Sequence, residues 1–195
     1  MLSSIHPLGE RARNNQWSIT VISFTLASTT AGALVGTALG AVGALALGGV
    51  SETMLLAVTG LAVIAAATLD LRRVDPPGPS RQVNETWIGH YRGWVYGGAF
   101  GAELGVGVAT YVVTWGVYAT FVAEIATASP ATGALVGAVF GFGRSLALLL
   151  AGLIDRPSRL TAFHNRMAQL GLPVHRGTAF GSVTAGLIAT AGALL

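Results

Sequence analysis

Residues 91–115 read YRGWVYGGAFGAELGVGVATYVVTW, and beyond its arginine this stretch carries a single charge, the carboxylate of Glu103. The apolar character continues on the C-terminal side, where residues up to 154 add only Glu124 and Arg144. Soluble domains carry charge on about a quarter of their residues, whereas this chain carries it on 10%. Apolar runs of about 18 residues or more are typical of membrane-spanning helices. The sequence therefore predicts an all-α integral membrane protein.

The apolar blocks divide into five predicted spans, which follow a cytoplasmic N-terminal segment, residues 1–17, and make residues 18–195 one transmembrane domain. The spans are 18–46, 53–70, 93–122, 131–154 and 177–195. The first and third exceed the roughly 20 residues that a crossing needs, so each must tilt, protrude from the bilayer or break. No turn signal divides either one, which favours five spans over seven.

The arginines outside the spans lie in three clusters. They are Arg11 and Arg13; Arg72, Arg73, Arg81 and Arg92; and Arg156, Arg159, Arg166 and Arg176. Basic loops stay in the cytoplasm, which predicts a multi-pass protein of the inner (plasma) membrane with a cytoplasmic N-terminus and an external C-terminus. The positive balance thus indicates topology and contact with the lipid bilayer, not nucleic acid. The absence of Lys with abundant Ala, Gly and Arg is typical of a GC-rich bacterial genome.

Two repeating patterns organise the chain. An Asp, a Pro-Ser-Arg run and an Arg-Gly-x-x-aromatic-Gly motif occur in that order within residues 70–97 and again within 155–181, which predicts a parallel internal repeat. Small residues also recur at every fourth position. The glycines among them are Gly32, Gly36 and Gly40; Gly93, Gly97, Gly101 and Gly105; Gly133, Gly137 and Gly141; and Gly177 and Gly181. This spacing predicts glycine-zipper packing, either within one bundle or against a second copy or a partner membrane protein.

The charges inside the spans suggest a site. Glu103 and Arg144 each lie ten residues from the cytoplasmic end of their predicted spans, about 15 Å deep at 1.5 Å per residue. A lone charge at that depth costs about 2.5–3.5 kcal/mol or more, so we expect the two to form an ion pair. Hydroxyl groups complete the predicted substrate-binding site. Thr110 and Thr114 share the helical face of Glu103 toward the outer side, and Ser28, Thr29, Thr30 and Ser145 lie at matching depth on the first and fourth spans. The alternative is a structural ion pair with hydroxyls bonded to their own backbone.

The run YGGAFGAELGVGVAT, residues 96–110, resembles the glycine-rich helix of the CcdA/DsbD-like membrane proteins of thiol electron transfer, within the superfamily of LysE-type transporters. In that family a Thr-Pro-Cys turn follows, and Thr110 falls at its threonine. Tyr111 and Val112 replace the proline and cysteine, and the chain has no cysteine anywhere. The resemblance therefore implies a transport relative without the redox chemistry.

No motif predicts catalysis, a metal site or a cofactor, so we do not expect an enzyme. Two functions remain open. One is a small membrane transporter or permease with a polar site around Glu103 and Arg144, working as a homo-oligomer. The other is an accessory or assembly subunit of a larger membrane protein complex, in which the ion pair is structural and the glycine faces bind partners.

Overall fold

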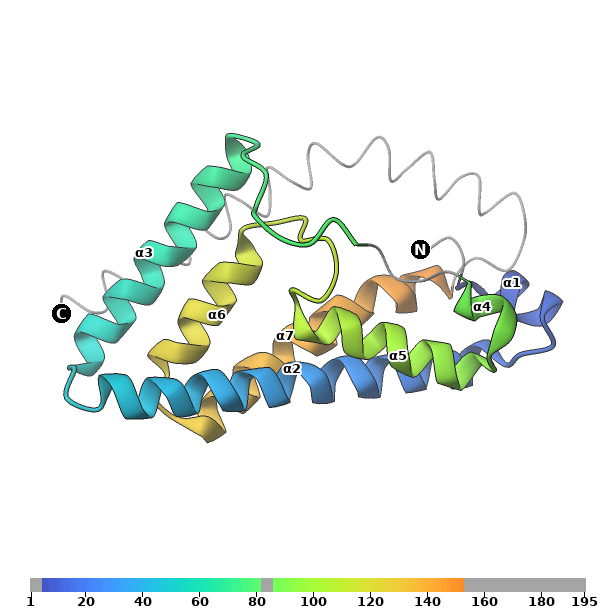
Figure 1. Ribbon diagram of the computed structural model, residues 1–195, viewed down its shortest axis with the longest axis horizontal. Helices are drawn as coiled ribbons and strands as arrows, with labels where there is room; N and C mark the ends of the chain where they lie inside the picture. The colour runs from blue at the N-terminus through green and yellow to red at the C-terminus, as the bar shows by residue number, and fades with distance from the viewer. Residues whose placement is uncertain (1–4, 82–85, 153–195) are drawn as a thin grey trace.

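The computed structural model describes residues 5–81 and 86–152, and these are all-helical, without any strand in the described ranges. The seven helices are α1 (Pro7–Ala12), α2 (Trp17–Leu47), α3 (Glu52–Leu71), α4 (Trp87–His90), α5 (Gly93–Val106), α6 (Gly116–Ala126) and α7 (Pro130–Ala151). The long helix α2 is the axis of the fold, with α5 and α7 packed along it and α3 and α6 at an angle to it (Figure 1).

Glycine permits the close approach of α2 and α7. A β-carbon added to Gly36 would lie 2.0 Å from the carbonyl oxygen of Gly133, and one added to Gly137 would lie 2.1 Å from that of Gly32. Such distances are far below van der Waals contact, so only a residue without a side chain fits. The residue numbers rise along one helix as they fall along the other, which makes the pair antiparallel.

The contact between α2 and α5 also depends on glycine, but these two helices are parallel. β-carbons on Gly101 and Gly105 would lie 2.2 and 2.3 Å from the carbonyl oxygens of Phe24 and Ser28. Here both sets of numbers rise together, so α5 runs parallel to α2. Both helices also begin after a short helix, α1 and α4 respectively (Figure 1).

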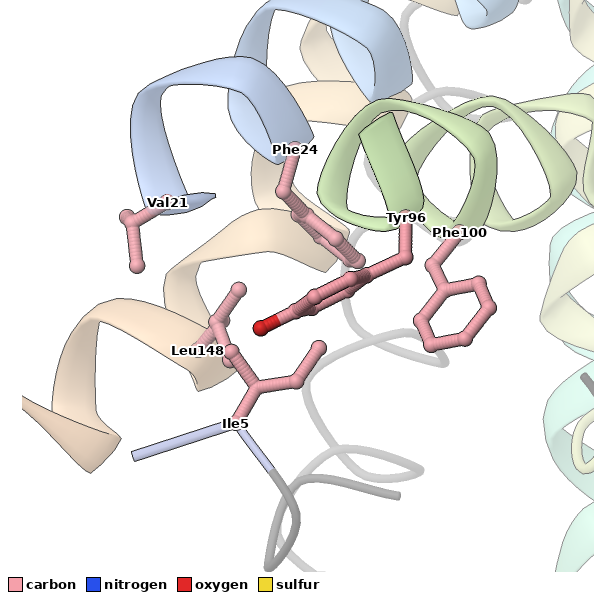
Figure 2. Packing of buried hydrophobic residues seen from close by; sticks show 6 residues of the cluster. All are labelled: Ile5, Val21, Phe24, Tyr96, Phe100 and Leu148. Atoms are coloured by element: carbon pink, nitrogen blue, oxygen red, sulfur yellow. The ribbon is translucent and has the colours of Figure 1, made fainter. Parts of the chain in front are cut away.

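The bulky side chains of the fold gather at the N-terminal end of α2. Tyr96 and Phe100 of α5 pack with Phe24 of α2, Leu148 of α7 and Ile5, and all five are at most 2% exposed. Figure 2 shows the Tyr96 ring lying between the side chains from the other segments. This cluster is the main hydrophobic core, and it joins the N-terminal segment to three long helices.

The predicted third span, 93–122, is broken in the structure. Helix α5 ends at Val106, and Gly107 has a φ of 86°, a conformation that glycine adopts without penalty and other residues rarely adopt. Residues 107–115, here called the return segment, then lead back to the end of α3, where α6 starts (Figure 1). With 14 and 11 residues, α5 and α6 are about 21 and 16 Å long. Neither covers a core about 30 Å thick by itself.

The other predicted helices agree with the structure in extent. The ranges 18–46, 53–70 and 131–154 correspond to α2, α3 and α7. Among the described residues, α2 and α3 have the length and composition that a membrane crossing requires. The span 177–195 and the second copy of the repeat lie outside the described residues, and the five-span topology and its orientation remain predictions.

Candidate functional site

The carboxylate that the sequence pairs with Arg144 has another partner. Oε1 of Glu103 accepts a hydrogen bond from Nη2 of Arg81 at 2.8 Å, so the predicted ion pair between Glu103 and Arg144 is wrong. The reason is the helix break. Because the return segment folds back onto the loop after α3, with the Tyr111 N–H donating to the carbonyl of Arg81 at 2.9 Å, that loop comes close to the end of α5.

Arg144 lies on α7 with its guanidinium over its own helix neighbour, 5.3 Å from the centre of the Phe140 ring. A cation above an aromatic face gains about 0.5–2 kcal/mol. Its Nη1 atom is buried and makes no hydrogen bond within the described chain, and the same holds for Oε2 of Glu103. Glu103 and Arg144 therefore each have one buried polar atom without a hydrogen-bond partner in the described chain.

The predicted hydroxyl residues are not brought together into one site. Ser28 donates to the carbonyl of Gly141 at 2.7 Å and so links α2 to α7. Ser145 and Thr30 bond to carbonyls of their own helices, which is the structural alternative. Thr29 lies at the same contact between α2 and α7, since its Cα is 3.1 Å from the β-carbon position of Gly141.

The remaining two threonines lie in the return segment. Thr110 is buried, whereas Thr114 is exposed and donates to Oδ2 of Asp70 at 2.5 Å. The Trp115 N–H donates to the other oxygen of Asp70 at 2.9 Å, and its indole Nε1–H donates to the carbonyl of Val74 at 2.8 Å. A carboxylate at the first N–H groups of α6 is favourable. Asp70 thus fixes where α6 begins, a role that sequence reasoning missed.

A second missed residue is Glu124, near the end of α6. Its side chain is fully buried, and neither carboxylate oxygen makes a hydrogen bond in the part of the chain that the structure describes. The predicted spans 93–122 and 131–154 leave Glu124 in the short connection between them, which the predicted topology puts outside the membrane. The sequence signal that could have indicated a buried Glu124 was its position next to the apolar residues of the predicted third span. A glutamate two residues before the end of a helix can direct its side chain toward the neighbouring helices.

A third missed residue is Glu10 of α1, which is also fully buried. Its carboxylate accepts hydrogen bonds from Arg13 Nη2 at 2.6 Å, from Thr20 Oγ1 at 3.0 Å and from the Tyr96 hydroxyl. Partial burial lowers the pKa of Arg13, but the hydrogen bond and the charge of Glu10 raise it, and the net pKa lies above its usual value. These bonds attach α1 to α2 and α5, and they adjoin the core cluster through Tyr96.

Within residues 5–81 and 86–152, no three His, Asp or Glu side chains come together in a way that could hold a metal ion. The described polar residues instead form three groups. The carboxylate of Glu10 accepts from three donors, and the group at the return segment is largely exposed. Glu124 is fully buried and Arg144 is half-buried, and neither forms an ion pair among the described residues. The last group is the one whose chemistry the fold leaves unused.

Comparison with known proteins gives one relationship. The chain is similar to the methylamine utilization protein MauF of Paracoccus versutus, with 34% identity over 150 residues. The match covers 74% of this chain and 54% of MauF, so the chain spans about half the length of that relative. No protein-family model and no solved structure matches the chain.

This similarity overturns the suggested resemblance to the CcdA/DsbD-like proteins. That resemblance rested on one glycine-rich run, residues 96–110, whereas the match to MauF extends over 150 residues. The physical reason for the error is visible in the fold. Gly97, Gly101 and Gly105 are required by the contact of α5 with α2, and close-packed helices of unrelated proteins share such spacing.

Proposed function

We propose that this protein is a membrane-embedded accessory protein of methylamine utilization that acts on another protein component and is not itself an enzyme. The observation that carries this proposal is the similarity to MauF, whose name assigns that protein to methylamine utilization. The match extends over 150 residues and is not confined to one motif, which supports a shared role.

The fold supports placement in a membrane. Large apolar side chains are exposed along α2, α3 and α7. The most exposed on these helices are Leu26, Leu34, Leu45, Leu61, Leu135 and Val139. Soluble monomers rarely expose apolar patches larger than a few hundred Å², and lipid is the solvent that such surfaces suit. The glycine contacts of α2 with α5 and α7 are of the kind that holds helices together where no hydrophobic driving force exists.

The orientation proposed from the arginine clusters can be tested with reporter fusions. Alkaline phosphatase fused at Gly49, in the exposed turn between α2 and α3, should be active because that turn lies outside. A fusion at Ser80, in the arginine-containing loop after α3, should be inactive. Equal activity at both positions would contradict a membrane crossing by α3, and the reverse pattern would invert the topology.

The accessory role makes a specific genetic prediction. Deletion of the gene in its own host should abolish growth on methylamine as the sole nitrogen source but leave growth on ammonium unchanged. Restoring the gene should restore growth. The deletion strain should still take up radiolabelled methylamine, since an accessory protein acts after or beside uptake.

A second candidate, a permease for a small solute, is favoured by one observation. Helices that break within the membrane often line substrate sites, and α5 ends at Gly107 next to Phe140, the residue that Arg144 covers. The uptake measurement separates the two functions. Loss of methylamine uptake in the deletion strain would support the permease, and normal growth on methylamine would exclude both.

A further inference from the structure

Glu124 reaches the place where the backbones of α2 and α7 touch. Its Oε1 lies 3.1 Å from the position of a β-carbon on Gly137, and the same position lies 2.1 Å from the carbonyl oxygen of Gly32. The carboxyl group is therefore directed into the contact of two glycine-lined helix faces. The side chain is 0% exposed, and neither oxygen makes a hydrogen bond in the described ranges.

No cation on the neighbouring helices compensates this carboxylate. Helix α2 contains no ionisable residue, and α3 carries only Glu52 and Asp70, at its two ends. Asp70 is already bound to Thr114 and Trp115. On α7 the only charged residue is Arg144, seven residues beyond Gly137, which corresponds to about 10 Å along a helix. Its guanidinium covers Phe140.

An ionised carboxylate without water, a cation or a hydrogen-bond donor is among the most costly groups to bury. A protonated carboxyl removes that cost, because it is neutral and its O–H can donate. A helical carbonyl oxygen keeps a second lone pair as an acceptor, and the carbonyl of Gly32 is adjacent. Among the described residues, the contact offers an acceptor for a neutral carboxyl and neither a donor nor a cation for an anion.

We propose that Glu124 is a proton-binding site at the contact of α2 and α7, and that it holds its proton as long as α6 is packed there. Loss of the proton creates a charge that needs water or a cation, so α6 must then separate from the two glycine faces. The site couples proton release to the position of α6. It is independent of the role in methylamine utilization and can be tested on purified protein.

The first test uses a hydrophobic carbodiimide on protein in detergent or vesicles. The carboxyl adds across a C=N bond of the reagent, its proton passes to nitrogen, and rearrangement leaves a stable N-acylurea. We expect the peptide that contains Glu124 to gain the mass of one reagent molecule, and the yield to fall at least tenfold as the pH is raised. The exposed Glu52 serves as the internal control, and a water-soluble carbodiimide should favour it instead. An unlabelled Glu124, or labelling independent of pH, would overturn the proposal.

The second test compares the wild type with Glu124→Gln, which keeps the shape of a neutral carboxyl. A free Glu titrates near pH 4.3, so above about that pH the unfolded chain releases a proton that the folded chain retains. The stability of the wild type should then fall as pH rises, and its Tm should drop by several degrees relative to Glu124→Gln. Glu52→Gln should follow the wild type. A Tm of Glu124→Gln well below that of the wild type at every pH would show an ionised Glu124 and overturn the proposal.

Discussion

Two glutamates that pack against α2, Glu10 near its N-terminal end and Glu124 near its middle, are fully buried and differ in their surroundings. Glu10 has a guanidinium and two hydroxyl donors around it, whereas Glu124 has no hydrogen-bond partner among the described residues. Glu10 lies where side chains as large as Tyr96 fill the space between helices. Glu124 lies where glycines bring the backbones into contact and leave no room for a donor side chain.

The difference shows that burial alone does not define the role of a charged residue in this fold. Glu10 accepts hydrogen bonds from Arg13, Thr20 and Tyr96, and these attach the N-terminal segment to the bundle. Glu124 has none, so its charge state must change for it to be buried. The predictions below test this contrast and the helix geometry that produces it.

The largest effect is expected for Glu10→Gln. The substitution removes the charge that Arg13 faces and leaves buried donors without a full set of acceptors. Breaking a buried pair costs about 3–5 kcal/mol, and because Arg13 is partly exposed we expect about 3 kcal/mol. Thermal unfolding in detergent at neutral pH would measure it. The matched substitution Glu124→Gln should not lower the stability. An equal loss of stability in the two variants would show that the two glutamates do not differ in their stabilising contacts.

The second prediction concerns the glycine contact that isolates Glu124. Gly137→Ala should destabilise the protein by about 2–3 kcal/mol because the added methyl group overpacks a backbone contact. Gly143→Ala on the same helix should have little effect, since a β-carbon there has no neighbour within 4 Å. Folded yield and Tm of the two variants would be compared. If both substitutions were tolerated equally, α7 would not be in backbone contact with α2 at Gly137.

The third prediction concerns the helix break. Gly107→Ala should cost about 1–2 kcal/mol, because a residue with a side chain is strained at positive φ. If residues 93–122 formed one continuous helix, the same substitution would instead stabilise it by up to about 1 kcal/mol. The sign of the change in Tm therefore distinguishes the broken helix from the continuous one.

The smallest effect is expected at the surface. Arg81 is 66% exposed in its ion pair with Glu103, and exposed pairs contribute about 0–1 kcal/mol. A double-mutant cycle of Glu103→Gln with Arg81→Gln should give a coupling energy in that range. The cycle of Glu103→Gln with Arg144→Met should give none. A coupling of the second pair that exceeded the first would restore the ion pair predicted from sequence.

The errors in the predicted site have a common origin. Depth was estimated by counting residues along a continuous helix, and this placed Glu103 opposite Arg144. The count itself holds, because residues 93–103 lie within α5, but the break at Gly107 turns the chain back toward the loop after α3, whose Arg81 bonds to Glu103. Nothing in the local sequence predicts the break, because glycines recur through the stretch for packing reasons. Arg81 is 22 residues from Glu103 and belongs to a loop, so its approach depends on where the return segment lies.

The sequence by itself determined that α2, α3 and α7 are helical, and it placed their first residues to within one position. Runs of apolar residues, bounded by glycine, proline and charged residues, specify this locally, because helix formation involves neighbours three and four residues apart. It also determined which helix faces can pack closely, since glycine spacing is a local property. The tertiary structure decided which faces meet, where the third apolar stretch breaks, and which donors surround each carboxylate. Those outcomes depend on contacts between segments distant in the chain. They give one buried glutamate, Glu10, three donors and leave the other, Glu124, without a hydrogen-bond partner among the described residues.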